Sequence, residues 1–261
     1  MMQKLISIDL KADFGFLRKP DTNDGISMSY NMLHKPGLLG IFGAILGMEG
    51  YQKRGELPEY YQKLKGLKVG IEPLYHQNGN FPKTTIVYTN TVGYANKDGN
   101  FIAYENTLIR PSYRVYVAVD TDDPLICYLK HGQAEYIPYL GKNEFPVWWE
   151  EFREYELQPF GFDQDFEVKT LFVKKEEDDR ARSNESGSRP LGFAALLSKF
   201  TDAFFYFERL PLGFREFESS KRGKEYQYDL VPFVYSNAKF KADFLIDNLY
   251  SIGNNEVVQL N

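Results

Sequence analysis

A lysine and a histidine stand next to each other at Lys130 and His131. A histidine can accept a proton from a ribose 2′-hydroxyl while a lysine stabilises the phosphate, which makes this pair a candidate for metal-independent RNA cleavage. The same residue types also suit an ordinary helix C-terminus, and we favour that explanation. The other histidines, His34 and His76, have no metal-ligand spacing to this pair. We therefore predict no metal site and no cofactor.

A glycine-rich stretch, HKPGLLGIFGAILGMEG, begins at His34 and Lys35. Pro36 suits the first position of a helix, which predicts a helix from there. Glycines recur at helical spacing, at Gly40, Gly43 and Gly47. Each one costs about 1 kcal/mol relative to alanine, so close approach of another group must offset it. Close helix–sheet packing is one explanation, and a phosphate at the helix N-terminus beside His34 and Lys35 is the other.

Two arginines and a tyrosine, Arg110, Arg114 and Tyr116, are spaced to share one face of a strand. Sheet faces that combine cations with aromatic rings bind single-stranded RNA in RNA-recognition domains. A solvated face explains the same pattern, and without further information it is the preferred interpretation.

The elements that position these residues are strands and helices in alternation. Apolar residues from Ile6 to Phe14 alternate with polar ones, which predicts a strand with one buried and one solvent-facing side. Residues 17–31 are predicted to form a polar loop. Asp123 is a suitable cap for a short helix that ends at about Lys130.

A hairpin is predicted where runs 84–95 and 101–109 flank Asp98 and Gly99, because Asp-Gly between β-rich runs is a strong turn signal. With a further strand at about 67–73, the order of elements predicts an α+β fold of the ferredoxin-like kind.

Composition excludes several classes of protein. The 261 residues carry a net charge of −5, which argues against a uniformly basic nucleic-acid binder. Residues 1–119 hold 14 Lys and Arg against 10 Asp and Glu, whereas residues 120–261 hold 17 against 26, so a basic face is expected in the front half. The single cysteine, Cys127, excludes an internal disulfide. No apolar run approaches the roughly 20 residues that span a membrane, and no secretory signal is visible, so we expect a cytoplasmic protein without a membrane partner.

Four stretches of the chain resemble the Cas five family of CRISPR-associated RAMP proteins, nearest the type I-B branch. They are DLKADFGFLRKP, SYNMLHKPGLLGIFGAILGMEGY, ENTLIRPSYRVYV and YLGKNEFP. A fifth stretch, FERLPLGF, resembles the C-terminal part of the family more weakly. The four stretches follow one another in order within residues 4–146, and the second is the most specific.

The resemblance implies an architecture and a role. It implies a ferredoxin-like, RNA-recognition (RAMP) domain over 1–146 with a projecting hairpin thumb at about 84–109, and a smaller β-containing C-terminal region over 147–261. Residues 174–190 hold no large apolar residue and are expected to be a mobile loop. Such proteins are subunits of Cascade, where they hold the 5′ handle of the CRISPR RNA and cap one end of the filament of backbone subunits. The implied partners are CRISPR RNA, the Cascade backbone subunit and the large subunit, with target DNA reached indirectly through the guide.

The motifs that carry the resemblance also contain the candidate RNA-binding residues. In this role cations would bind phosphates, Tyr30 or Tyr116 would stack on a base, and glycines would allow close approach of a backbone. The candidates are Arg18, Lys19, Tyr30, His34, Lys35, Gly40, Arg110, Arg114, Tyr116, Gly141, Lys142 and Asn143.

Catalysis is the main alternative. In the type I-C branch the corresponding subunit also cuts precursor RNA with a Tyr, a Lys and a His, but the surroundings of Lys130 and His131 do not match that branch. We therefore favour binding without catalysis, with a metal-independent endoribonuclease as the alternative and an inert protein–protein module as a third possibility.

Overall fold

The structure is a computed structural model that describes residues 3–20, 25–90, 101–173, 200, 202–219, 223–242, 244 and 246–261. Within these ranges the helices are α1 Lys35–Ile45, α2 Glu59–Leu64 and α3 Pro124–His131. The strands of the first half are β1 Gln3–Ala12, β2 Phe14–Gly15, β3 Leu17–Arg18, β4 Ile26–Tyr30, β5 Lys68–Leu74, β6 Lys83–Asn90, β7 Phe101–Ile109 and β8 Ser112–Asp120. Those of the second half are β9 Val147–Glu156, β10 Gln158–Pro159, β11 Phe166–Val168, β12 Phe205–Ser219, β13 Gly223–Ser236, β14 Lys239–Phe240, β15 Leu249–Gly253 and β16 Glu256–Gln259. The fold is α+β, with few helices and both parallel and antiparallel strand pairs.

The central sheet has the strand order β5-β8-β1-β9, and each neighbouring pair is antiparallel. Along the chain its elements follow one another as β1, α1, β5, β8, α3 and β9. Alternate apolar side chains of β1, such as Ile6, Ile8 and Leu10, are buried in the same core cluster as Leu38 and Phe42 of α1. Period-two alternation therefore predicted this face of β1 correctly.

The second face of the central sheet corrects the prediction that it is solvent-facing. Ser7 and Asp9 of β1 are buried, and Leu5 packs in one cluster with Tyr116 of β8 and Val258 of β16. Strands from the C-terminal end of the chain therefore cover part of this face. Polar residues could be placed there because they pair with one another, as Asp9 does with Arg114.

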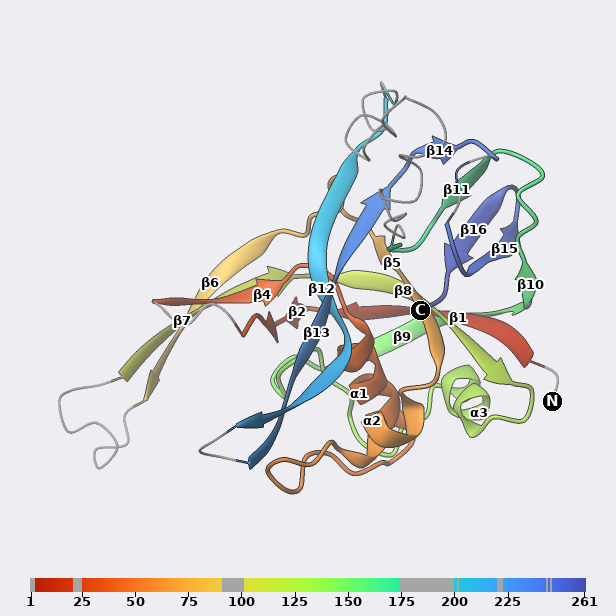
Figure 1. Ribbon diagram of the computed structural model, residues 1–261. Coiled ribbons are helices and arrows are strands. Elements are labelled where there is room, and N and C mark those ends of the chain that lie inside the picture. The colour runs from red at the N-terminus through yellow and green to blue at the C-terminus, as the bar shows by residue number, and fades with distance from the viewer. Residues whose placement is uncertain are drawn as a thin grey trace.

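A long hairpin, β6 and β7, projects from the body of the molecule (Figure 1). The two strands are antiparallel from the Lys83–Leu108 pair outwards, as the sequence predicts, while the Asp98-Gly99 turn lies outside the described residues. The expected polar loop at 17–31 is wrong for most of its described part, because β3 pairs with β4 and β4 runs parallel to β7. Strand β4 is stabilised by hydrogen bonds to β7 of the hairpin, a partner that the local sequence pattern of residues 17–31 does not reveal.

The second half of the chain forms two further units. Strands β12 and β13 make a long antiparallel hairpin that crosses α1, and a five-stranded sheet has the order β10-β15-β16-β11-β14 (Figure 1). Strand β9 begins at Val147 but pairs with β1, so the central sheet extends beyond the expected boundary at 146. The expected mobile loop at 174–190 lies outside the described residues.

Helix α3 confirms the predicted short helix, because the Asp123 side chain accepts a hydrogen bond from the Leu125 amide at 2.8 Å. The helix stops at Gly132, which adopts a left-handed conformation with φ of 64°. Among the described helices, none combines the length and the apolar character that a bilayer crossing requires.

Candidate nucleic-acid interface

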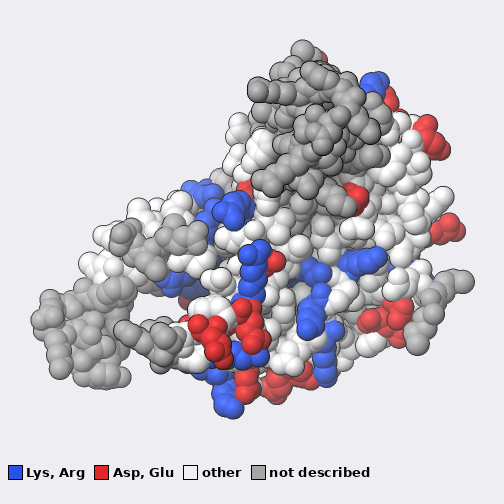
Figure 2. Space-filling view, viewed as in Figure 1, with Lys and Arg blue, Asp and Glu red and all other residues white. Residues whose placement is uncertain are grey.

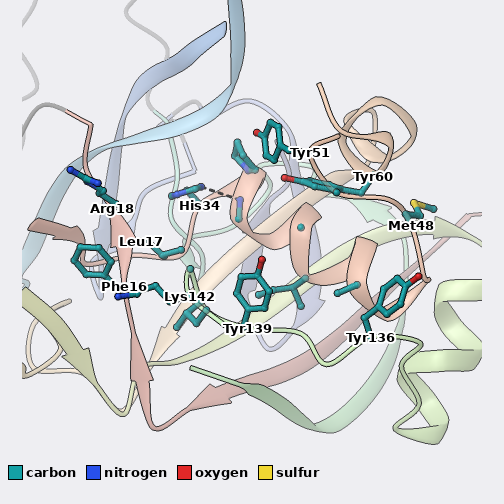
Figure 3. Close-up of a pocket in the computed structure, with 18 of the residues that line it drawn as sticks. Phe16, Leu17, Arg18, His34, Met48, Tyr51, Tyr60, Tyr136, Tyr139 and Lys142 are labelled. Atoms are coloured by element: carbon teal, nitrogen blue, oxygen red, sulfur yellow. Dashed lines mark hydrogen bonds between the residues drawn. The ribbon is translucent and has the colours of Figure 1, made fainter. Parts of the chain in front are cut away.

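A cavity of about 710 Å³ lies beside the first helix, within the range of roughly 300–1,000 Å³ that is common for small-molecule and cofactor sites. Its walls come from distant parts of the chain: β3, α1, the segment around Tyr51 and Tyr60, the turn 139–146 and the β12–β13 hairpin. Figure 3 shows Arg18 and Lys142 on one side of it and Tyr51, Tyr60 and Tyr136 on the other.

Several candidates from the sequence meet in this cavity. It is lined by Arg18, His34, Gly40, Gly141 and Lys142, which belong to three separate stretches of sequence. Each of the three stretches carries part of the family resemblance, so the fold brings these motifs to one place.

His34 has a structural task at the start of α1. Its ring nitrogen Nδ1 accepts a hydrogen bond from the Gly37 amide at 3.1 Å, which caps the helix. Burial lowers the pKa of His34 to about 3, so the ring is neutral at pH 7. The neighbouring Lys35 Nζ donates to the Asn261 carbonyl oxygen at 3.0 Å. The side chains of His34 and Lys35, which were expected to lie at a phosphate site at this helix end, therefore already form internal hydrogen bonds.

Lys142 is the inner cation of the cavity. Burial lowers its pKa, but the hydrogen bond to Glu105 at 2.8 Å and the charge of that carboxylate raise it more, so the pKa lies above its ordinary value. The ammonium group also lies 3.9 Å from the centroid of the Tyr88 ring of β6. Lys142 therefore stays charged and is held at the base of the hairpin, on the same side of the cavity as the exposed Arg18 (Figure 3).

The turn 139–146 is fixed by its contact with β2 and β3. The Phe16 amide donates to the Leu140 carbonyl oxygen at 3.0 Å. Gly141 has φ of 87°, and a Cβ atom there would lie 1.9 Å from the Phe16 carbonyl oxygen. Only glycine fits, so the glycine of the YLGKNEFP motif sets the position of Lys142.

The glycines of α1 are explained by a tyrosine that the sequence analysis did not single out. At Gly43 a Cβ atom would lie 2.4 Å from the Cβ atom of Tyr60, and at Gly40 it would lie 3.7 Å from the Tyr60 ring. The expected helix–sheet packing at Gly40 and Gly43 is therefore corrected, because the close neighbour is a side chain of α2. The spacing of the glycines indicated a close neighbour but did not identify Tyr60.

Sequence reasoning missed the aromatic lining of the cavity. The chain has 19 tyrosines, so no single one stood out. Tyr51 and Tyr139 are 62% and 48% exposed, large values for aromatic rings in a folded protein. Burial raises the pKa of both Tyr51 and Tyr60, so both are neutral at pH 7.

Other expected RNA-binding residues lie elsewhere. Lys19 forms an ion pair with Glu208 at 2.8 Å and lies 5.1 Å from the centroid of the Tyr30 ring. Tyr30 is buried and makes an edge-on contact with His34, so it does not present a face to a base in this conformation. Asn143 is exposed in the turn 139–146, outside the lining of the cavity.

The expected RNA-binding face of β8 needs correction. Arg110 precedes the strand, with φ of 48°, so it does not share a strand face with Arg114. The Arg114 guanidinium binds the Asp9 carboxylate through two hydrogen bonds of 2.6 and 2.9 Å. Tyr116 is fully buried and donates to Glu72 at 2.9 Å. These side chains pair with neighbouring strands of the central sheet, and Tyr116 cannot stack on a base.

Lys130 and His131 lie in the last turn of α3 and outside the cavity. The ring nitrogen Nδ1 of His131 lies 2.9 Å from the Cys127 carbonyl oxygen, and Lys130 Nζ lies 3.5 Å from a Glu154 oxygen. The first contact is ordinary for a helix C-terminus, and the second is a surface ion pair with strand β9. In the described ranges, no group of three or more His, Cys, Asp or Glu residues could hold a metal ion.

Charge is mixed on the face shown in Figure 2, where Lys and Arg are interspersed with Asp and Glu. The cavity repeats this pattern, because Glu49 and Glu105 line it together with the two cations. Which ligands such a site selects depends on the position of each charge rather than on an overall positive field.

No protein-family model matches the chain, and no curated protein sequence matches it. Several solved structures are similar to it. A chain from the cryo-EM structure of the type III-B Cmr-beta bound to cognate target RNA and AMPPnP has a TM-score of 0.49 and 10% identity, over 98% of this chain and 99% of that chain. A chain from a CRISPR RNA-guided surveillance complex has a TM-score of 0.45 and 14% identity, over 91% and 92%. CRISPR associated protein Cas6 has a TM-score of 0.28 and 14% identity, over 99% and 100%.

Proposed function

We propose that this chain is a non-catalytic RNA-binding subunit of a type I CRISPR Cascade complex of the type I-B kind, which holds the 5′ handle of the CRISPR RNA. The observation that carries the proposal is the cavity beside α1, where two cations and several uncharged aromatic rings from distant motifs meet. Cations that bind phosphates, next to rings that stack on bases, are the combination by which proteins bind single-stranded RNA.

The proposed architecture is a ferredoxin-like RAMP domain with β6 and β7 as its thumb. The order β5-β8-β1-β9, with β1-α1-β5-β8-α3-β9 along the chain, supports this because it is the strand order of a ferredoxin-like fold. Lys142 connects the thumb to the cavity through its contacts with Glu105 of β7 and Tyr88 of β6. RNA that enters the cavity would therefore touch the base of the thumb.

Binding without cleavage is supported by the surroundings of Lys130 and His131. Neither lines the cavity, and both are engaged at the end of α3. His34, the one histidine among the described residues that line the cavity, is a poor general base, because its Nδ1 already accepts a hydrogen bond from the Gly37 amide and burial lowers its pKa to about 3.

The proposed partners follow from the proposed role. They are CRISPR RNA, the Cascade backbone subunit whose filament this chain would cap, and the large subunit, and we propose that the chain acts in the cytoplasm. Target DNA would be read by the guide, while protein contacts hold backbone and shape.

One gel tests binding and cleavage together. The purified chain is incubated with end-labelled CRISPR repeat RNA in EDTA, and the sample is run in native and denaturing lanes. We expect a shifted band in the native lane and intact RNA in the denaturing lane. A specific shorter product that disappears in His131→Ala would favour the endoribonuclease instead, and an unshifted band would argue against RNA binding.

A further inference from the structure

Four tyrosines converge at one end of the cavity beside α1. Tyr51, Tyr60, Tyr139 and Tyr228 all line it, and burial together with the nearness of the other three raises the pKa of Tyr60. They come from four separate parts of the chain: Tyr51 lies before α2, Tyr60 within α2, Tyr139 at the start of the turn 139–146, and Tyr228 in β13. Figure 3 shows Tyr51 and Tyr60 close together over α1, with Tyr139 facing them from below. We call this group the tyrosine cluster.

From this arrangement we infer that the tyrosine cluster is a subsite for one unpaired nucleobase of the bound RNA, whose phosphate lies at Arg18 and Lys142. The inference rests on the proposed function and adds to it the class of ligand and the residues that take it.

The chemistry of the cluster suits a base and not a phosphate. Burial raises the pKa of Tyr51, Tyr60 and Tyr228, so all three rings are neutral at pH 7. Tyrosine rings stack on any base, and hydroxyl groups can donate to or accept from its edges. The cations of the cavity lie at its other side, beside Phe16 and the thumb.

Packing holds the inner rings in place before any ligand arrives. Tyr60 rests on α1, where Gly43 leaves room for its Cβ atom and Gly40 for its ring. Tyr228 stacks on Phe214 with ring centroids 5.1 Å apart, and Phe214 packs edge-on against Tyr61 at 4.9 Å. A site whose rings are already fixed loses little conformational entropy on binding. Tyr51 and Tyr139, which are exposed, form the rim.

The volume agrees with such a ligand. The cavity of about 710 Å³ is larger than a single base needs, and it extends to the two cations, so a base and its phosphate fit along it. A peptide side chain could also stack on the rings, but its binding would not depend on a base at one position of the RNA.

The test measures the affinity of the full chain for repeat RNA by fluorescence anisotropy, with a series of RNAs that each carry one abasic nucleotide. The variants are Tyr51→Leu and Tyr139→Leu at the rim, with Tyr75→Leu as the matched control. Tyr75 is 83% exposed and does not line the cavity. We expect the rim variants to lose about five- to 100-fold in affinity, with an unchanged salt dependence, and the control to lose nothing.

The abasic series decides whether one base occupies the cluster. The loss caused by Tyr51→Leu should disappear for the RNA that is abasic at one position and persist for the others. An equal loss with every RNA, or no loss at all, would overturn the subsite while RNA binding by the chain stands. If the unaltered chain bound no repeat RNA, the proposed function would fail, and the subsite would fail with it.

Discussion

The two glycines that lie under Tyr60 should respond in opposite ways to alanine. Glycine inside a helix costs about 0.5–1 kcal/mol relative to alanine, so a harmless Gly→Ala change in α1 should stabilise the protein by that amount. At Gly40 the new Cβ atom would lie 3.7 Å from the Tyr60 ring, which is ordinary van der Waals contact. We therefore expect Gly40→Ala to raise the free energy of unfolding by about 0.5–1 kcal/mol.

Gly43→Ala should lower the free energy of unfolding instead. Its Cβ atom would lie 2.4 Å from the Cβ and 2.9 Å from the Cγ atom of Tyr60, atoms that cannot turn away because they adjoin the backbone of α2. Overpacking of this kind costs about 1–3 kcal/mol, and the gain in helix propensity offsets about 1 kcal/mol of it. The net change is a loss of up to about 2 kcal/mol, so the two variants should differ by about 1–3 kcal/mol.

Urea denaturation followed by circular dichroism measures both variants, with the slope m as a check that the unfolded state is unchanged. If Gly43→Ala were as stable as Gly40→Ala, the packing of Tyr60 on α1 would not explain the glycines.

Three further predictions concern residues around the site. His34 has a folded pKa of about 3, below its unfolded value near 6.5, so the unfolded state binds the extra proton between these pH values and stability falls as pH drops through them. The loss in the free energy of unfolding should reach about 4–5 kcal/mol below pH 3. His34→Asn keeps a capping oxygen but has no titrating ring, so it should remove this part of the pH dependence of stability. Tyr116→Phe removes the hydrogen bond to buried Glu72, so it should cost about 1–3 kcal/mol of stability without changing RNA affinity, a result that a stacking role would contradict. His131→Ala should leave RNA binding unchanged in a native gel, because its ring contacts its own helix.

Local patterns predicted much of the fold. Alternation identified the buried face of β1, the Asp-Gly signal lay between the two strands of the β6–β7 hairpin, and Asp123 marked the start of α3. The polar face of β1 was misjudged because its cover comes from β16, more than 200 residues further along the chain. No local periodicity records a partner at that distance.

The candidate site was predicted in the same uneven way. Arg18, Gly141 and Lys142 could be named because they stand in motifs, and the fold brings them to one cavity. Arg114 and Tyr116 are also a cation and an aromatic residue, but they form internal contacts, since Arg114 pairs with Asp9 and Tyr116 with Glu72. The sequence shows which side chains can bind RNA, whereas burial decides which of them are available.

The salt dependence of RNA affinity tests the central claim most directly. Each phosphate contact to single-stranded RNA contributes about 0.7 to the slope of log K against log salt concentration. We expect Arg18→Gln and Lys142→Gln each to weaken binding of repeat RNA and to reduce that slope by about 0.7. Lys241→Gln is the matched control, because Lys241 also pairs with a carboxylate, that of Asp165, and does not line the cavity. If both cavity variants kept the affinity and slope of the unaltered chain, the cavity would not be where this protein holds RNA.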